Sequence, residues 1–210
     1  MKNLLVLLVF FQVTLSNGQE QPVLFSDALR VNFSKYVSQS NLAYKQGDFE
    51  RGQFLFDSLV KHQLIGSKFN NYTLKRVSDR KLKMSKVKKP IFLITYASWC
   101  VPSKGEFLAL NKLAKEYQNE VEFIVIVWGK KKEVKKYSNK LTSHIEVCYA
   151  HKSFKSGNEL VENLRETLGF PTCYLIDSYL QVVDIKRGNV NIPLQTPTKK
   201  ALELNYNTFK

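Results

Sequence analysis

The sequence predicts an α/β sandwich preceded by a helical N-terminal extension. From residue 91 onward, short apolar runs of strand length alternate with segments that repeat apolar residues at three- and four-residue spacings, as in a sheet covered by helices. Between residues 26 and 65 the helical spacing dominates. The 210 residues are 44% apolar and 12% aromatic, which excludes a disordered chain despite a net charge of +14.

The first 18 residues have the pattern of a secretory leader. Lys2 precedes an unbroken apolar run from Leu4 to Phe11, and small residues follow at Ser16 and Gly18. Eight apolar residues are too few to span a bilayer, for which about 20 are needed. We therefore expect an exported protein, periplasmic or secreted, in an oxidising compartment where disulfide chemistry is possible.

Residues 19–65 are expected to form the helical extension, and residues 66–210 the sandwich domain. Apolar residues recur at helical spacing on both sides of a break at Gly47-Asp48, which predicts two amphipathic helices. Between Gly66 and Pro90 the chain is polar and basic with short alternating pieces, which favours a hairpin at the edge of a sheet.

The sandwich domain begins with a strand, a helix and a second strand. Residues 91–96 and 121–128 are buried-strand runs, and an apolar helical stripe lies between Phe107 and Tyr117. Short links between them predict a parallel pair joined by a right-handed crossover.

The same alternation continues to the C-terminus. Gly169 is expected to end a helix, Asp177-Ser178 to connect two strands, and Thr196-Pro197 to start the last helix with a capping hydroxyl and a first-turn proline. The expected elements are a basic helix over 131–141, a strand over 145–149, a helix over 158–168, strands over 173–176 and 181–185, and a C-terminal helix from 197.

A cysteine stands at the end of the first buried strand. Cys100 is expected at the start of a helix, where unsatisfied N–H groups and the positive end of the helix dipole favour thiolate over thiol. Trp99 would shield one side of the sulfur, and Lys104 would add a positive charge one turn into the helix. The other interpretation is a cysteine that only fills a strand end.

The segment Ala97-Ser98-Trp99-Cys100-Val101-Pro102-Ser103 resembles the active-site stretch of the thioredoxin fold, in which a Trp precedes Cys-x-x-Cys. Gly169-Phe170-Pro171-Thr172 is similar to the cis-proline loop of that fold, and Gly188 to the glycine of its last strand. The long stretch between Cys100 and Pro171 resembles the exported TlpA-like branch. The resemblance implies a three-layer sandwich with a central mixed sheet.

The resemblance also assigns roles to residues. Cys100 and Ser103 would be catalytic. Pro171 would be cis and face Cys100, and the backbone of Phe170 would pair with an extended peptide. The residues implied to bind substrate are Trp99, Pro102, Phe170, Pro171 and Thr172.

The sequence departs from the family pattern at the second cysteine, which is replaced by Ser103. A mixed disulfide on Cys100 would find no resolving thiol three residues on. Ile94 occupies the position of the buried Asp that assists deprotonation of the resolving cysteine in many thioredoxins. Ser103 would still be able to donate a hydrogen bond that stabilises the Cys100 thiolate.

The other two cysteines have two interpretations. Cys148 and Cys173 would either form a structural disulfide or be two buried free cysteines, and the sequence does not decide between them. Cys173 lies near the proline loop, but alternation along its strand can aim its side chain away from Cys100. Cys148 and His151 have a metal-like spacing without a second such pair, so we expect no metal and no cofactor.

Basic residues gather in two clusters. Residues 75–89 hold eight Lys or Arg against one Asp, and residues 130–136 form a second cluster. No nucleic-acid-binding motif accompanies them, so nucleic acid is not an expected partner. They would be solvated faces, or would steer the protein toward acidic protein partners or an anionic membrane surface.

Two functions are consistent with these observations. In the first, a single-thiol enzyme attacks protein disulfides through Cys100, as an isomerase or as a reductase with an external thiol. In the second, the fold has lost turnover and holds extended polypeptide in the cleft around Trp99, Phe170 and Pro171.

Overall fold

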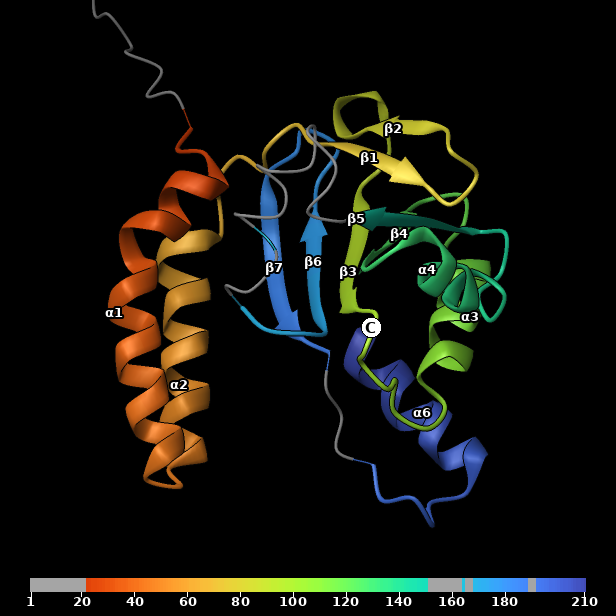
Figure 1. Cartoon of the computed structure of the whole chain (residues 1–210). Coiled ribbons are helices and arrows are strands. Elements are labelled where there is room, and N and C mark those ends of the chain that lie inside the picture. The colour runs from red at the N-terminus through yellow and green to blue at the C-terminus, as the bar shows by residue number, and fades with distance from the viewer. Residues whose placement is uncertain (1–21, 151–163, 165–167, 189–191) are drawn as a thin grey trace, which may run out of the picture.

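The computed structural model describes residues 22–150, 164, 168–188 and 192–210 (Figure 1). The expected leader lies outside these residues, as does most of the expected helix over 158–168.

Two antiparallel helices form the N-terminal part, as predicted. Helix α1 spans Phe25–Lys45 and α2 spans Phe49–Leu59, and α2 runs on into a π-helical turn, η1, over Val60–Leu64. Gly47 makes the break with a φ of 73°. Asp48 then caps α2 by accepting the Arg51 N–H at 2.8 Å.

A seven-stranded mixed sheet forms the centre of the described structure, with the order β2-β1-β5-β4-β3-β6-β7. The strands are β1 (Thr73–Arg76), β2 (Lys81–Lys83), β3 (Ile91–Ala97), β4 (Glu122–Trp128), β5 (Ile145–Ala150), β6 (Thr172–Ile176) and β7 (Val182–Arg187). Strands β3, β4 and β5 are parallel, and the remaining pairings are antiparallel. The predicted parallel pair and the predicted edge hairpin, β1 with β2, are both confirmed.

The helices of the sandwich domain whose bounds lie within the described residues are η2, a 3-10 turn over Met84–Lys86, α3 (Glu106–Glu116), α4 (Lys131–Ser138) and α6 (Thr198–Phe209). Two predicted helix starts are wrong. Helix α3 begins at Glu106, six residues after Cys100, because Pro102 disfavours helix at Val101 and Gly105 turns the chain with a φ of 80°. Thr196 does not cap α6, because it is bound in a turn to Pro193 O and the extended Pro197 takes the N-cap position.

Helices cover both faces of the sheet, so the fold is a three-layer sandwich (Figure 1). Helices α1, α2 and η1 pack on one face, and their apolar residues share a core with β3, β6 and β7. Helices α3, α4 and α6 pack on the other face. The sheet therefore separates two cores.

One arginine joins the helical hairpin to the sheet. Arg187, at the end of β7, donates hydrogen bonds to the hydroxyls of Tyr44 at 2.5 Å and Tyr36 at 2.6 Å. Its guanidinium also lies 4.4 Å from the centre of the Phe56 ring.

Candidate functional site

Cys100 follows β3 in a tight loop. Its N–H donates to Ala97 O at 2.9 Å, and the Ala97 N–H donates to the sulfur at 3.4 Å. The hydroxyl of Tyr137, from α4, donates to Cys100 O at 2.7 Å and holds the loop from the other side. The cysteine is half-buried, and these hydrogen bonds hold its backbone on both sides.

The loop that precedes β6 lies at the same end of the sheet. Thr95 and Thr172 are neighbours in the antiparallel pairing of β3 with β6, and the Thr95 hydroxyl donates to Thr172 O at 3.2 Å. The peptide bond between Phe170 and Pro171 is cis. The ring of Phe170 meets the indole of Trp99 edge-on, with 6.4 Å between their centres. This contact joins the two loops that the sequence resemblance singled out.

Gly188 holds the proline loop from behind. Its N–H donates to Pro171 O at 3.0 Å. A Cβ at this position would lie 3.2 Å from Pro171 Cγ and 3.3 Å from Cys173 Sγ. Only a residue without a side chain fits this approach without displacing its neighbours.

The expected substrate-binding residues differ in how they are placed. Trp99 is 77% exposed, Val101 beside it is 91% exposed, and Phe170 and Pro171 are half-buried. The Thr172 side chain is buried and donates to Gly169 O at 2.8 Å, so it shapes the loop and adds nothing to the surface. Pro102 lies half-buried in the loop after Cys100.

Ser103 is tied to the C-terminal helix. Its hydroxyl donates to Asn205 Oδ1 at 2.9 Å, and Asn205 Nδ2 donates to Lys104 O at 2.9 Å. Asn205 is fully buried in α6. The hydroxyl proton of Ser103 is therefore directed to Asn205, and the predicted hydrogen bond to the Cys100 thiolate is not formed.

A buried acid, Glu106, lies beside these residues. It accepts the Ser103 N–H at 2.6 Å and a short hydrogen bond from the Tyr96 hydroxyl. Burial raises the pKa of the Glu106 carboxyl, although hydrogen bonding from Tyr96 and from the backbone and side chain of Ser103 opposes this. Sequence reasoning missed this residue. The signal was the Ser103-Lys104-Gly105-Glu106 spacing, in which a Glu three residues after a Ser is typical of a capping box.

The predicted activation of Cys100 is wrong. Burial raises the pKa of its thiol, the hydrogen bond from Ala97 opposes this, and the negative charge of Glu106 raises the pKa further. Because α3 begins at Glu106, its first N–H groups lie beyond the cysteine loop. Lys104 is also in the loop, where its Nζ donates to Leu194 O at 3.2 Å.

The other two cysteines are buried and free. Cys148 lies in the core on one face of the sheet and Cys173 in the core on the other face, so they form no disulfide. Burial raises the pKa of the Cys148 thiol to about 12 and raises that of Cys173 well above its ordinary value. Of the two interpretations, two buried free cysteines is the one that the structure has.

His151 lies outside the described residues. Within the part of the chain that the structure describes, no group of three or more His, Cys, Asp or Glu side chains is placed to hold a metal ion. The helices described there include none that is both long and apolar enough to cross a membrane.

The sequence is similar to a known family and to a protein of known sequence. The model of the AhpC/TSA family matches residues 65–185. The thioredoxin-like protein YneN of Bacillus subtilis is 25% identical over 139 residues, which are 66% of this chain and 76% of that protein.

Two solved structures resemble the fold. The putative thiol:disulfide interchange protein DsbE of Chlorobium tepidum has a TM-score of 0.50 at 21% identity and covers 69% of this chain and 96% of its own. The thioredoxin domain of a thiol-disulfide oxidoreductase of Bacteroides vulgatus has a TM-score of 0.52 at 17% identity and covers 69% and 94%. The predicted thioredoxin-like sandwich is confirmed.

Proposed function

Because the chain belongs to the AhpC/TSA family and has a thioredoxin-like fold, we propose that it is a single-thiol protein that acts on the disulfides of other proteins through Cys100. The observation that carries the proposal is the placement of the half-buried Cys100 thiol beside the exposed Trp99, at the loop that contacts Phe170. Exposed apolar side chains around a thiol suit a polypeptide substrate.

The chemistry is one thiol-disulfide exchange. Cys100 loses its proton, and the thiolate attacks one sulfur of a partner disulfide. A new S–S bond forms to Cys100, and the other partner sulfur leaves as a thiolate that takes up a proton. Because residue 103 carries a hydroxyl, release requires a thiol of the partner, which gives isomerisation, or an external thiol, which gives net reduction.

The raised pKa of the Cys100 thiol affects the rate of attack on a partner disulfide. A raised pKa lowers the fraction of thiolate at any given pH, so capture of a partner is slower than with an activated cysteine. A slow thiol suits an oxidising compartment, because partner disulfides persist there long enough to be attacked. The same proposal includes export through the leader over residues 1–18, a helical extension over 19–65 and membership of the TlpA-like branch.

The raised pKa of Cys100 also favours a second candidate function. With the thiolate disfavoured by burial and the Ser103 hydroxyl directed to Asn205, the fold would hold extended polypeptide without covalent chemistry. The cleft would then be formed by Trp99, Phe170 and Pro171.

Capture of a protein disulfide separates the two candidates. The purified chain is incubated with scrambled ribonuclease, quenched with acid and analysed by non-reducing electrophoresis and mass spectrometry. The single-thiol function predicts a covalent 1:1 adduct that Cys100→Ser abolishes and Cys173→Ala retains. Non-covalent retention of the substrate by both variants, with no adduct in the unaltered protein, would establish the binding module instead.

A further inference from the structure

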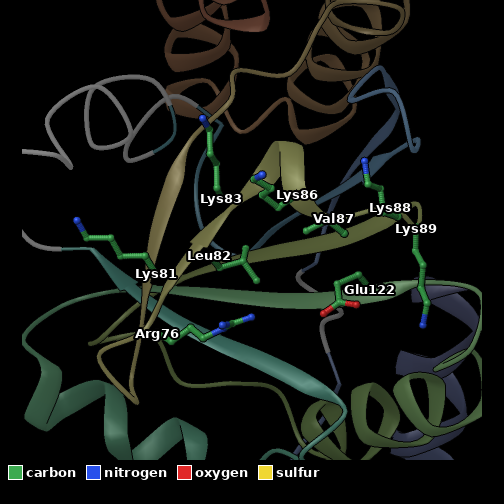
Figure 2. A pocket seen from close by; sticks show the side chains of 9 residues that line it. All are labelled: Arg76, Lys81, Leu82, Lys83, Lys86, Val87, Lys88, Lys89 and Glu122. Carbon is green, nitrogen blue, oxygen red and sulfur yellow. The ribbon is translucent and has the colours of Figure 1, made fainter.

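A lysine-rich hollow lies between the β1–β2 hairpin, the segment that follows it and the start of β4. It has a volume of about 410 Å³, which is in the range of ligand sites. Leu82 and Val87 are its apolar residues, and Glu122 is its one acid (Figure 2). The cationic lining residues are Arg76, Lys81, Lys83, Lys86, Lys88 and Lys89.

Most of this positive charge is unbalanced. Arg76 forms an ion pair with Glu146 at 2.8 Å, and Lys89 Nζ donates to Gln118 O at 2.7 Å. Across residues 22–150, 164, 168–188 and 192–210, the side chains of Lys81 and Lys83 form no ion pair, and the same is true of Lys86 and Lys88. A negatively charged partner would therefore relieve repulsion among these lysines.

The backbone of β2 is open on its outer side. Among the described strands, β2 is at the edge of the sheet and pairs only with β1. The ladder bonds Arg76 N to Arg80 O (2.9 Å) and Met84 N to Tyr72 O (3.0 Å) fix which residues face β1. Since bonded and non-bonded pairs alternate in an antiparallel ladder, the N–H and C=O groups of Lys81 and the N–H group of Lys83 point outward. The C=O of Lys83 is used by the first turn of η2, whose N-cap is Lys83.

We propose that β2 accepts an extended acidic segment of a partner protein as an additional strand. The outward N–H and C=O groups of Lys81 and the N–H group of Lys83 would form the ladder. Directly opposed residues on neighbouring strands point to the same face, so the residues opposite Lys81 and Lys83 are acidic. The residue between them faces the side of Leu82 and is apolar. The recognised pattern is therefore acidic, apolar, acidic.

The same lysines argue against other occupants. A second copy of the chain would place lysine against lysine, and edge lysines are a common means of preventing such pairing. A membrane surface would favour apolar side chains that insert, but in the described residues no large, exposed apolar side chain lies between Ile65 and Trp99.

The binding site is independent of Cys100. Glu122 and Lys89 lie at the start of β4 and just before β3, whereas Cys100 follows the end of β3. The hollow and the thiol are thus at opposite ends of the sheet. A partner on β2 leaves the thiol free, and the inference goes beyond the proposed function.

Fluorescence anisotropy with a labelled peptide tests the proposal. The peptide carries Glu-Val-Glu-Val-Glu with both ends blocked, and the protein carries Cys100→Ala so that no exchange takes place. Three comparison peptides are used. The first is Glu-Glu-Glu-Val-Val in the same flanks. The other two are the alternating peptide N-methylated at its second and fourth residues, and the alternating peptide N-methylated at its first, third and fifth residues. Strand addition predicts that the contiguous peptide and one of the two methylated forms bind at least about tenfold more weakly.

Charge reversal identifies the surface. Lys81→Glu with Lys83→Glu is expected to weaken binding of the alternating peptide by at least about tenfold, because two attractive cross-strand pairs become repulsive. Lys199→Glu with Lys200→Glu, on the exposed start of α6, changes the net charge equally and is expected to have an effect below about twofold.

A proline distinguishes backbone pairing from charge alone. Lys83→Pro and Lys83→Ala both remove the ammonium, but only the proline removes the outward N–H, at a position with a φ of −94° on an edge strand. Circular dichroism verifies that both variants fold. Weaker binding by the proline variant supports strand addition. Equal affinity of the two variants, equal affinity of all peptides, or charge-dependent binding only to phosphatidylserine vesicles would overturn the proposal.

Discussion

Ser103 and Asn205, 102 residues apart in the chain, are joined by a hydrogen bond of 2.9 Å from the serine hydroxyl to the amide oxygen. Residue 103 is the position at which the family pattern places a second thiol. In this chain the serine at position 103 is bound to α6. Within the described residues, its hydroxyl is the one donor to Asn205 Oδ1, while Asn205 Nδ2 donates to Lys104 O and Ala201 O. The C-terminal helix therefore fixes the loop that carries Cys100.

Ser103→Cys is expected to give the protein turnover. The new thiol stands three residues after Cys100 and resolves its mixed disulfide, so the variant should reduce insulin with dithiothreitol as the electron source. Loss of the hydroxyl donor to buried Asn205 should lower the free energy of unfolding by about 1–3 kcal/mol. Ser103→Ala is the control, which should lose the stability and gain no activity. Insulin turbidity that stays at the uncatalysed rate with Ser103→Cys would contradict the prediction.

Asn205→Ala is expected to lower the free energy of unfolding by roughly 3 kcal/mol, since it leaves the Ser103 hydroxyl and Lys104 O without their partner at a buried site. Urea denaturation followed by fluorescence measures the change. Asn207→Ala, on the exposed side of the same helix, should change it by less than about 0.5 kcal/mol. Similar losses in the two variants would show that the contact with the Cys100 loop contributes little.

Glu106→Gln is expected to lower the pKa of the Cys100 thiol. The carboxylate raises that pKa by charge repulsion with the thiolate, so a neutral amide removes the repulsion. The rate of iodoacetamide alkylation at Cys100, measured by mass spectrometry across pH, should have its midpoint at a lower pH than in the unaltered protein. Glu203→Gln, an exposed change on α6, should leave the midpoint in place. A midpoint unmoved by Glu106→Gln would mean that burial alone sets the pKa.

The same acid makes stability depend on pH. Because burial raises the Glu106 pKa above its usual 4.5, the folded state holds this proton more tightly than the unfolded chain. The resulting stabilisation is complete below pH 4.5 and is lost as the pH rises through the raised value. Urea titrations at a series of pH values should therefore show the unaltered protein losing stability relative to Glu106→Gln as the pH rises through this window. A constant difference would be inconsistent with the raised pKa.

Arg187→Ala is expected to loosen the helical hairpin. It removes two hydrogen bonds to tyrosine hydroxyls and the contact with the Phe56 ring, a loss of roughly 3 kcal/mol. Limited proteolysis should cleave α1 or α2 sooner than in the unaltered protein. Arg80→Ala, remote from the hairpin, serves as the control. Equal cleavage rates in both variants would show that apolar packing alone holds the hairpin.

The secondary structure was predictable because it depends on local periodicity. The parallel pair of β3 with β4 followed from two apolar runs and a helical stripe between them, and the edge hairpin from polar alternation. The start of α3 was misjudged because Val101 and Gly105, rather than the end of β3, decide where helical φ and ψ begin.

The site was predictable only in part. The motifs placed Trp99 and Phe170 at one end of the sheet, where their rings meet. The contacts of Glu106, Asn205 and Tyr137 with this loop depend on packing between elements distant in sequence, and no periodicity encodes such contacts. The predicted lowering of the Cys100 pKa depended on a helix that begins at the cysteine. Because α3 begins at Glu106 instead, that prediction had the wrong direction.

The separation of the two buried cysteines by the sheet limits how many disulfide partners the molecule can hold at once. With Cys148 and Cys173 enclosed in different cores and both held protonated, Cys100 alone offers a sulfur to solvent. The folded chain can thus be covalently linked to one partner at a time. If Cys100 forms mixed disulfides as proposed, each molecule would end a disulfide-linked chain of proteins, because a single point of attachment cannot branch or extend it.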